Sequence, residues 1–444
     1  MKVALLGFGI EAQSAYNFLK KKYPSATFDI YDQNQISKVK TPEGSEIFLG
    51  VSDFSSIDAD LLVRTPAINP KDLPISANVT SVTNLFFEQC RAPIIGVTGS
   101  KGKGTTASFI TEILRSAGLK VQLLGNIGIP ALDKIDDINQ DSIVVYELSS
   151  FQLWDLKYAP RVAVITNIEP DHLDVHDDFD DYVSAKMNIT RLQDSSDFLV
   201  YNYLNKIVRD NVSKIKTEAS TNFIPFPSDK FAKVLGDYFY WKDEKLFSTD
   251  AVKLPGKHNL MNALAAMDAT FNILVEKGLE FENIKQAWKS GLSAFEGLPH
   301  RLKFVTEKSG VRYYDDSIAT TPGSAIAAID SFKGPKILIM GGSNKGADLN
   351  ELIEKVALSG EKEIKKVILI GDESNNLEKL LLDKKFNRFI NLGLDTDMQK
   401  IVKSASSISN SGDIVILSPA HASFDMFKSY SDRGEQFIKA VKEL

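Results

Sequence analysis

Short apolar runs alternate with longer amphipathic stretches through the first part of the chain. VALLGFG and TFDIYD are predicted strands, residues 11–22 between them have helical spacing, and EIFLGV, DLLVRT and NVTSVT are further short strands. Strands that alternate with helices indicate a parallel sheet with helical crossovers. We therefore predict an α/β domain over residues 1–91.

The same alternation continues to the end of the chain in two further blocks. In residues 92–295 the strands are PIIGVT, VQLL, SIVVYE and VAVIT, and a long amphipathic helix opens near residue 255 and runs to about residue 276. In residues 296–444 the strands are VRYYDD, KILIMGG, KKVILIG and DIVILSPA. No linker-like composition marks the boundaries, so changes of pattern place them. The predicted fold is α/β with three domains.

A glycine-rich segment follows the first strand of the second block, in PIIGVTGSKGKGTTASFI (residues 93–110). Strand, glycine loop and helix N-terminus together bind phosphate, since glycines let backbone N–H groups converge and the helix dipole favours an anion. Lys103 can reach a polyphosphate, and Thr105 or Thr106 can offer a hydroxyl to Mg²⁺. The match to G-x-x-x-x-G-K-[ST] is imperfect, because Gly96 lies one residue too far upstream and Gly104 follows the lysine. The alternative is a glycine-rich turn with a solvated lysine.

The first block carries two weaker nucleotide signals. Its turn GFGIEA matches G-x-G-x-x-A, with Gly9, Ile10, Glu11 and Ala12 at the helix start, and Asp32 closes the next strand. This pattern places a pyrophosphate over a helix N-terminus with an acid near the ribose, although a tight packing turn gives the same pattern. A further candidate contact is the turn Arg64-Thr65-Pro66-Ala67, which follows a strand.

Polar side chains cluster after the strands of the second and third blocks. Glu147 follows SIVVY, where a metal ligand or a helix-capping carboxylate would fit. Five polar residues follow VAVIT within a short span, more than packing explains readily, and solvated loop acids are the alternative: Asn167, Asp171, His172, Asp174 and His176. In the third block, DDS, GGSNKG and SPAH end three strands, as expected for a site along one edge of a sheet.

Composition narrows the possible functions. The 444 residues are 43% hydrophobic and 25% charged, which is ordinary for globular domains. A net charge of −6 does not favour a nucleic-acid partner. Cys90 is the only cysteine, and no apolar run approaches the ~20 residues of a membrane span. The apolar N-terminus suits a first strand better than a signal peptide, so we expect a soluble, cytoplasmic protein without membrane insertion.

Taken together in order, the motifs resemble those of the Mur ligase family of ATP-dependent amide-forming enzymes. The resemblance covers essentially the whole chain and rests on GVTGSKGKGTT, GNIG, ELSSFQL, NIEPDHLDVH, GKHNLMN, GLPHRL, DSIATTP, GGSNKGAD and LSPAHASFDMFKSYSDRG. ELSSFQL and the ASFD run are typical of the members that add glutamate to UDP-N-acetylmuramoyl-L-alanine. The family's loop also carries the upstream-shifted glycine.

The resemblance implies a Rossmann-like UDP-binding domain, a P-loop-type ATPase domain with a mostly parallel sheet, and a Rossmann-like domain that binds the amino acid. It implies ATP, two Mg²⁺ ions, an acyl phosphate intermediate and a monomeric enzyme of peptidoglycan precursor synthesis. D-glutamate is the default substrate. L-glutamate addition and a folylpolyglutamate synthase-like activity are the alternatives. A further alternative, an NAD-dependent dehydrogenase built on the GFGIEA turn and Asp32, would leave the phosphate loop and the Glu147/His172 cluster unexplained. A non-catalytic nucleotide-binding protein is the last alternative, and it predicts that Lys103 and Glu147 could change without loss of chemistry.

Residue roles carry over from the family motifs by position. The catalytic residues would be Lys103, Glu147, His172 and Lys186, and the metal would be held by Thr105 or Thr106, Glu147, His172 and a carbamylated Lys186. ATP would bind Gly99, Ser100, Lys101, Gly102, Lys103, Gly104, Thr105, Thr106, Asn262, Arg301 and Asp316. The UDP-linked substrate would bind Gly9, Ile10, Glu11, Ala12, Asp32, Arg64, Thr65, Pro66, Ala67, Asn126 and His172. Glutamate would bind Thr320, Lys345, Ser418 and Phe424.

The chain departs from the family pattern at three positions. Gly104 replaces the usual Ser or Thr after the loop lysine, which leaves the metal hydroxyl open between Thr105 and Thr106. Ile318 stands where the common pattern has lysine, and His421 replaces the usual cysteine. Both of these lie near the expected amino-acid pocket, so they bear on the D or L configuration of the substrate.

Overall fold

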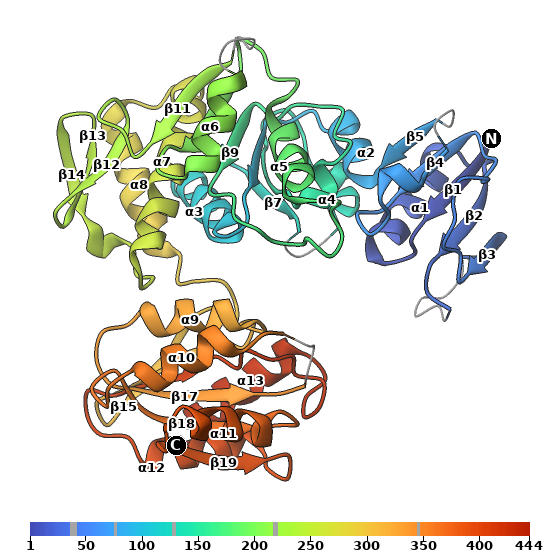
Figure 1. Cartoon of the computed structure of the whole chain (residues 1–444). Helices are drawn as coiled ribbons and strands as arrows, with labels where there is room; N and C mark the ends of the chain where they lie inside the picture. Colours follow the sequence, from blue (N-terminus) through green and yellow to red (C-terminus); the bar gives the residue numbers. More distant parts are fainter. Residues whose placement is uncertain (36–41, 75–77, 127–129, 216–220, 344–346) are drawn as a thin grey trace. The chain divides into compact units, whose positions relative to one another are not determined.

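The computed structural model describes residues 1–35, 42–74, 78–126, 130–215, 221–343 and 347–444 (Figure 1). The chain forms two compact units. The first comprises Met1–Val252 with Leu260–Phe295, and the second comprises Lys253–Asn259 with Glu296–Leu444. In the described part of the chain, no helix is both long and apolar enough to cross a membrane.

The first sheet is built by the start of the chain, as predicted. Its five strands lie in the order β3-β2-β1-β4-β5, and all of its pairs are parallel. The bounds are β1 Lys2–Leu6, β2 Thr27–Asp32, β3 Ser45–Leu49, β4 Leu61–Arg64 and β5 Val79–Ser81. The helices are α1 Ile10–Lys22 and α2 Val82–Gln89, with a 3₁₀ turn η1 at Pro70–Asp72. β1 is the central strand of this sheet, and Val3–Leu6 are all buried, as expected for a parallel strand that is covered on both faces.

The second sheet is also parallel, in the order β11-β10-β9-β6-β8-β7. Its strands are β6 Ile94–Thr98, β7 Val121–Gly125, β8 Ile143–Glu147, β9 Val162–Ile165, β10 Phe198–Asn202 and β11 Asn222–Phe226. The helices are α3 Lys103–Ser116, α4 Ser150–Leu153, α5 Phe179–Met187 and α6 Lys206–Ile215, with 3₁₀ turns η2 Ala131–Asp137 and η3 Asn188–Thr190. β7 and β8 lie on one side of β6, and β9, β10 and β11 lie on the other, so the strand order reverses beside β6. Ligands of open α/β sheets bind at such switch points.

A small antiparallel sheet in the first unit was not predicted. Its strands are β12 Ala232–Leu235, β13 Tyr238–Trp241 and β14 Glu244–Ser248, followed by the 3₁₀ turn η4 Thr249–Ala251. The long helix predicted to end near residue 276 is α7 Lys257–Glu276, and α8 Phe281–Ala294 follows it. The ring of Trp241 lies 4.5 Å from Phe271 on α7 and 5.0 Å from Trp288 on α8, which fixes the sheet to these helices.

The second unit contains a six-stranded sheet in the order β15-β16-β20-β17-β18-β19. Only the β15–β16 pair is antiparallel. The strands are β15 Lys303–Lys308, β16 Val311–Asp315, β17 Lys336–Gly341, β18 Ile364–Ile370, β19 Phe389–Gly393 and β20 Ile414–Leu417. The helices are α9 Pro322–Asp330, α10 Asn350–Leu358, α11 Ser374–Asp383, α12 Met398–Ser407 and α13 Tyr430–Lys442. Two apolar cores cover the two faces of this sheet, so its strands are buried on both sides.

Candidate active site

The glycine loop after β6 is closely packed against its neighbours. Gly102 has φ +84°, and a Cβ there would lie 2.6 Å from Asn262 Oδ1 on α7; Gly99 has φ +148°, and a Cβ there would overlap Thr166. Backbone N–H groups of Ser100 and Lys101 donate to Asn167, at 2.7 and 2.9 Å. Only glycine suits both conformations, and the loop leads directly into the N-terminus of α3.

Two lysine side chains converge on this loop. Lys103 Nζ donates to the carbonyl oxygens of Gly99 and Ser100, at 3.0 and 3.2 Å. Lys186 Nζ, on α5, donates to the same Gly99 oxygen at 2.9 Å. The structure therefore brings together two predicted catalytic residues that are 83 positions apart in sequence (186 minus 103). The charged amine of Lys103 beside the glycine loop can bind a polyphosphate.

Lys186 is almost completely buried, and the ring of Tyr182 lies 4.6 Å below its amine. Burial and then the neighbouring Lys103 lower the pKa of Lys186 to about 6, although Asp171 and Glu147 act in the opposite direction. The amine is therefore largely uncharged near neutral pH. An uncharged lysine amine is a nucleophile, whereas an ammonium is not.

Glu147 ends β8 with one oxygen unused. Its Oε1 accepts from Asn126 Nδ2 at 3.4 Å, and its Oε2 is buried with no hydrogen-bond partner in the part of the chain that the structure describes. Glu147 is not a helix cap, because Ser149 and Gln152 form the capping box of α4. One oxygen of the Glu147 carboxylate therefore has no partner among the described residues.

The residues present fit Mg²⁺ in their chemistry. Thr106 Oγ1 is buried and, like Glu147 Oε2, has no partner among the described residues, and both are the oxygen donors that Mg²⁺ prefers. Thr105 is also buried. Within the described residues, no three His, Cys, Asp or Glu side chains converge as a metal cluster. An ion here would therefore depend on hydroxyl and phosphate oxygens as well as on Glu147.

The five polar residues after β9 lie in different surroundings. Asn167 holds the glycine loop, whereas Asp171, His172 and Asp174 are exposed. His172 has φ +52° and pairs with Asp171 at 3.7 Å. His176 is buried and bonded through both ring nitrogens, so packing explains it. The metal role of His172 remains a prediction.

The glycine turn of the first sheet leaves the N-terminus of α1 open. Gly9 is the N-cap, no side chain caps the helix, and a Cβ at Gly9 would meet nothing within 4 Å. Asp32 Oδ2 accepts from Phe8 N at 2.7 Å. Burial acts to raise the pKa of Asp32, but hydrogen bonds from Asn34 and Phe8 lower it overall. Glu11 points toward the second sheet, where Gln152 Nε2 lies 3.5 Å from its Oε1, and burial raises its pKa.

Arg64 joins the first sheet to the segment that follows β8 of the second sheet. Its guanidinium is fully buried and forms a bidentate pair with Asp155, which follows α4. Its remaining donors bind the carbonyl oxygens of Phe151, Thr65 and Ile68. These bonds engage every nitrogen of the Arg64 guanidinium within the protein. The UDP contacts predicted for Arg64, Thr65, Pro66 and Ala67 stay predictions.

In the second unit, two predicted residues of different roles are hydrogen-bonded to each other. Ser418 Oγ donates to Asp316 Oδ2 at 2.8 Å, and Leu302 N donates to its Oδ1 at 3.1 Å. Burial raises the pKa of Asp316 to about 7, against these hydrogen bonds. Arg301 is exposed, Thr320 is half-buried and Phe424 is 70% exposed. Lys345 lies outside the described residues.

Two residues that the sequence analysis did not select organise this edge of the sheet. Arg433 is fully buried and donates to Ser317 Oγ and O, and to the carbonyl oxygens of His421 and Ala422. His300 Nδ1 lies 2.7 Å from Asp315 Oδ2, and this hydrogen bond raises the pKa of His300. His300 lies in the family motif GLPHRL and Arg433 lies in SDRG, so these two motifs could have indicated both residues.

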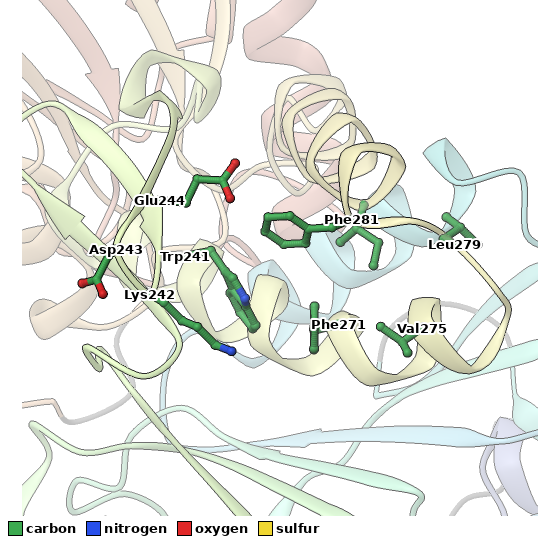
Figure 2. Close-up of a pocket in the computed structure, with 9 residues that line it drawn as sticks. Trp241, Lys242, Asp243, Glu244, Phe271, Val275, Leu279 and Phe281 are labelled. Atoms are coloured by element: carbon green, nitrogen blue, oxygen red, sulfur yellow. The ribbon is translucent and has the colours of Figure 1, made fainter.

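An open hollow of about 450 Å³ lies elsewhere in the first unit (Figure 2). Aromatic and aliphatic side chains from β13, α7 and α8 line it, and the charged residues of the β13–β14 turn stand at its edge. Its lining residues are Trp241, Lys242, Asp243, Glu244, Phe271, Val275, Leu279, Phe281 and Ile284. None of these is a predicted site residue, and none belongs to the glycine loop.

The parallel sheet has a glycine loop at its switch point, Lys103 and Lys186 meet beside that loop, and Glu147 Oε2 has no partner among the described residues. This arrangement is typical of nucleotide-binding enzymes of the P-loop type. Residues 97–270 match the Mur ligase middle domain, and residues 300–421 match the Mur ligase glutamate ligase domain. The chain belongs to the Mur ligase family, whose members are ATP-dependent ligases that form amide bonds.

Curated relatives match over the full length. The UDP-N-acetylmuramoylalanine–D-glutamate ligase of Acetivibrio thermocellus is 36% identical, with 100% of this chain and 96% of the relative covered. The enzyme of the same name from Clostridium tetani is 35% identical, covering 100% and 97%.

Solved structures with the same fold are more distant in sequence. The UDP-N-acetylmuramate–alanine ligase of Thermotoga maritima has a TM-score of 0.58 at 16% identity, covering 100% of this chain and 99% of that structure. The MurF ligase of the same organism, solved with ADP, has a TM-score of 0.56 at 19% identity, covering 99% and 95%. These likenesses show that the chain shares the α/β fold of these ligases, and a three-domain architecture is consistent with them.

Proposed function

We propose that this enzyme joins glutamate, D-glutamate by default, to UDP-N-acetylmuramoyl-L-alanine at the expense of ATP. The proposal places it in cytoplasmic peptidoglycan precursor synthesis as a monomer. The observation that carries it is the pairing of Lys103 and Lys186 over the Gly99 carbonyl, in a chain with full-length relatives of that activity. The proposed domains are residues 1–91 for the UDP substrate, 92–295 for ATP and 296–444 for the amino acid.

The reaction has two chemical steps. The substrate carboxylate attacks the γ-phosphorus of ATP, which gives an acyl phosphate and releases ADP. The amino group of glutamate then attacks the acyl carbon, and the C–O bond to phosphate breaks. Activation is needed because a carboxylate is a poor electrophile. Lys103, at the start of α3, neutralises charge on the transferring phosphoryl group while the loop amides hold it.

Glu147 and the Thr105/Thr106 pair are the proposed protein ligands of Mg²⁺, and Thr106 is favoured by its unpartnered hydroxyl. When bound, Mg²⁺ supplies charge neutralisation to the phosphates. Lys186 is proposed to carry a carbamate that supports a second ion, since its amine is buried beside the loop and lies 2.9 Å from Gly99 O. His172 is kept as a proposed contact of the ion and of the muramoyl-alanine portion.

The other roles follow the family motifs. Asn262, Arg301 and Asp316 are proposed for the nucleotide, Asn126 for the muramoyl-alanine portion, and Thr320, Lys345, Ser418 and Phe424 for glutamate. The second candidate is a folylpolyglutamate synthase-like ligase, which Lys103-Gly104-Thr105 favours. The N-terminal GFGIEA domain and the ASFD run weigh against it.

ADP release with UDP-N-acetylmuramoyl-L-alanine and a panel of amino acids tests the proposal. We expect D-glutamate to give the largest stimulation. Stimulation by no amino acid would contradict the ligase, and a larger effect of L-glutamate would correct the stereochemistry. Lys103→Ala should abolish acyl phosphate formation while calorimetry still detects UDP-substrate binding. Lys206→Ala, an exposed lysine on α6, is the matched control.

A further inference from the structure

His176 is buried between the turn after β8 and the helix α5. Its Nδ1 lies 2.7 Å from Asp181 Oδ2 on α5, and its Nε2 lies 3.0 Å from Ser150 Oγ at the start of α4. The ring stacks on Phe151, with centroids 5.5 Å apart and planes at 14°. A carboxylate at Nδ1 favours the tautomer with its proton there, so Nε2 accepts from the Ser150 hydroxyl. The imidazole therefore bonds two separate elements in one orientation.

These two elements carry both of the groups proposed around the metal. Ser150 follows Glu147 by three residues, on the helix whose capping box closes the turn. Asp181 precedes Lys186 by five residues on α5. A bond from Ser150 through His176 to Asp181 consequently fixes the distance between the turn that presents Glu147 and the helix that presents Lys186.

Tyr182 connects the same imidazole to the glycine loop. Its ring meets His176 edge to face, with centroids 5.2 Å apart, and its hydroxyl lies 2.8 Å from Ser100 Oγ. Its ring also lies beneath the Lys186 amine. A tilt of the imidazole would therefore move Tyr182, and with it the contacts to the loop and to Lys186.

Asp181 receives a second bond from the region of the first sheet. Lys71 Nζ, in η1, donates to Asp181 Oδ1 at 3.1 Å and also pairs with Asp177. Lys71 lies four residues after Ala67, the last residue of the candidate UDP turn. The pair of His176 and Asp181 is thus anchored from the regions of both the first and the second sheet.

We propose that His176 and Asp181 are positioning residues, which hold the Glu147 turn and the Lys186 helix in register with the phosphate loop. Neither is proposed to touch a substrate. Their contribution acts through Ser150 and Tyr182, and it is realised when ATP is bound and the phosphoryl group moves. The effect on turnover rests on the proposed function, whereas the effect on ATP binding rests on the family alone.

His176→Phe and Asp181→Asn test the proposal in the full-length protein. Phenylalanine keeps the aromatic stack but loses both hydrogen bonds, and asparagine keeps the shape of Asp181 without its charge. We expect each to lower the affinity for a non-hydrolysable ATP analogue about tenfold and kcat by at least as much, the scale of losing a charged, buried hydrogen bond. KM for the UDP-linked substrate should stay within about twofold. His176→Asn, whose amide can still donate toward Asp181, should recover part of the loss.

Asp180→Asn is the control, since Asp180 is the exposed acid next to Asp181 on the same first turn of α5. It should bind the ATP analogue and turn over as the unaltered protein does. Thermal melting of every variant separates positioning from unfolding, and Asp181→Asn serves if His176→Phe does not fold. Wild-type ATP affinity and kcat in folded His176→Phe or Asp181→Asn would overturn the proposal. If the unaltered protein shows no amino-acid-dependent ADP release, the proposed function fails, and the ATP affinities still decide the positioning role.

Discussion

Because burial lowers the pKa of the Lys186 amine, we predict that this amine reacts measurably with carbon dioxide. A lysine with the ordinary pKa of 10.5 is about 0.1% uncharged at pH 7.5, whereas a pKa of about 6 leaves about 97% uncharged. This is close to a thousandfold gain in the form that adds to CO₂. We expect the protein in ¹³C-bicarbonate at pH 7.5 to give a lysine carbamate signal in ¹³C NMR, and Lys186→Arg to abolish it.

The pH dependence has a defined sign. Because the pKa in the folded protein is lowered to about 6, the amine gains a proton only as pH falls through that value, and the carbamate signal should disappear there. An ordinary lysine would instead lose its reactive form below about pH 10. A signal that increases between pH 7 and pH 10 in proportion to hydroxide would refute the reasoning.

Removal of the side chain tests what the modified lysine does. Lys186→Ala should lower kcat by about 100-fold or more, the scale of losing one group that stabilises transition-state charge. A short carboxylic acid such as acetate should restore part of this activity, because its carboxylate can occupy the vacated space. Full activity of Lys186→Ala without added acid, or absence of any rescue, would contradict the carbamate.

Three further predictions concern affinity and stability. Arg64→Ala should lower the free energy of unfolding in urea by about 3 kcal/mol, because it leaves a carboxylate without its buried partner, and a loss below about 1 kcal/mol would contradict this. Gly102→Ala, whose Cβ would press on Asn262, should weaken ATP binding more than tenfold in calorimetry with UDP-substrate binding unchanged, whereas Gly323→Ala in open space should change neither. Burial raises the pKa of Asp268 well above its usual value, so its stabilising contribution is lost as pH rises above the unfolded pKa of about 4. Asp268→Asn should therefore raise the melting temperature at pH 8, with the gain shrinking toward pH 4; an equal gain at both values would contradict it.

The parallel sheets were predictable because their strands are continuous apolar runs that end at glycine or polar residues. β6, β8 and β17 are buried along their whole length, which is what a sheet covered on both faces requires. The antiparallel sheet β12–β14 was missed because β12 and β14 mix charged and apolar residues, and the short aromatic run of β13 has no apolar strand beside it in the sequence. Its stability comes from Trp241 packing on two later helices, which no local pattern contains.

The site was predictable where chemistry and backbone geometry coincide in sequence. The glycine loop is one example, since its positive φ angles require the residue that the sequence shows. Long-range bonds were not predictable. Arg64 was expected at a ligand, but its partner Asp155 lies 91 residues away. The two histidines of HLDVH also differ, because the turn sends His172 outward and His176 into the core.

The ion pair of Arg64 and Asp155 has a consequence for how separable the first sheet is. In a fragment containing only the first sheet, Arg64 would lose its partner Asp155, and Phe86 and Phe87 would lose their contact with Tyr146 of β8 and become exposed. Such a surface favours aggregation over independent folding. Residues 1–91 are therefore not a portable module, and exchanging them between relatives requires the helix α4 and Asp155, the second residue after it, to move with them.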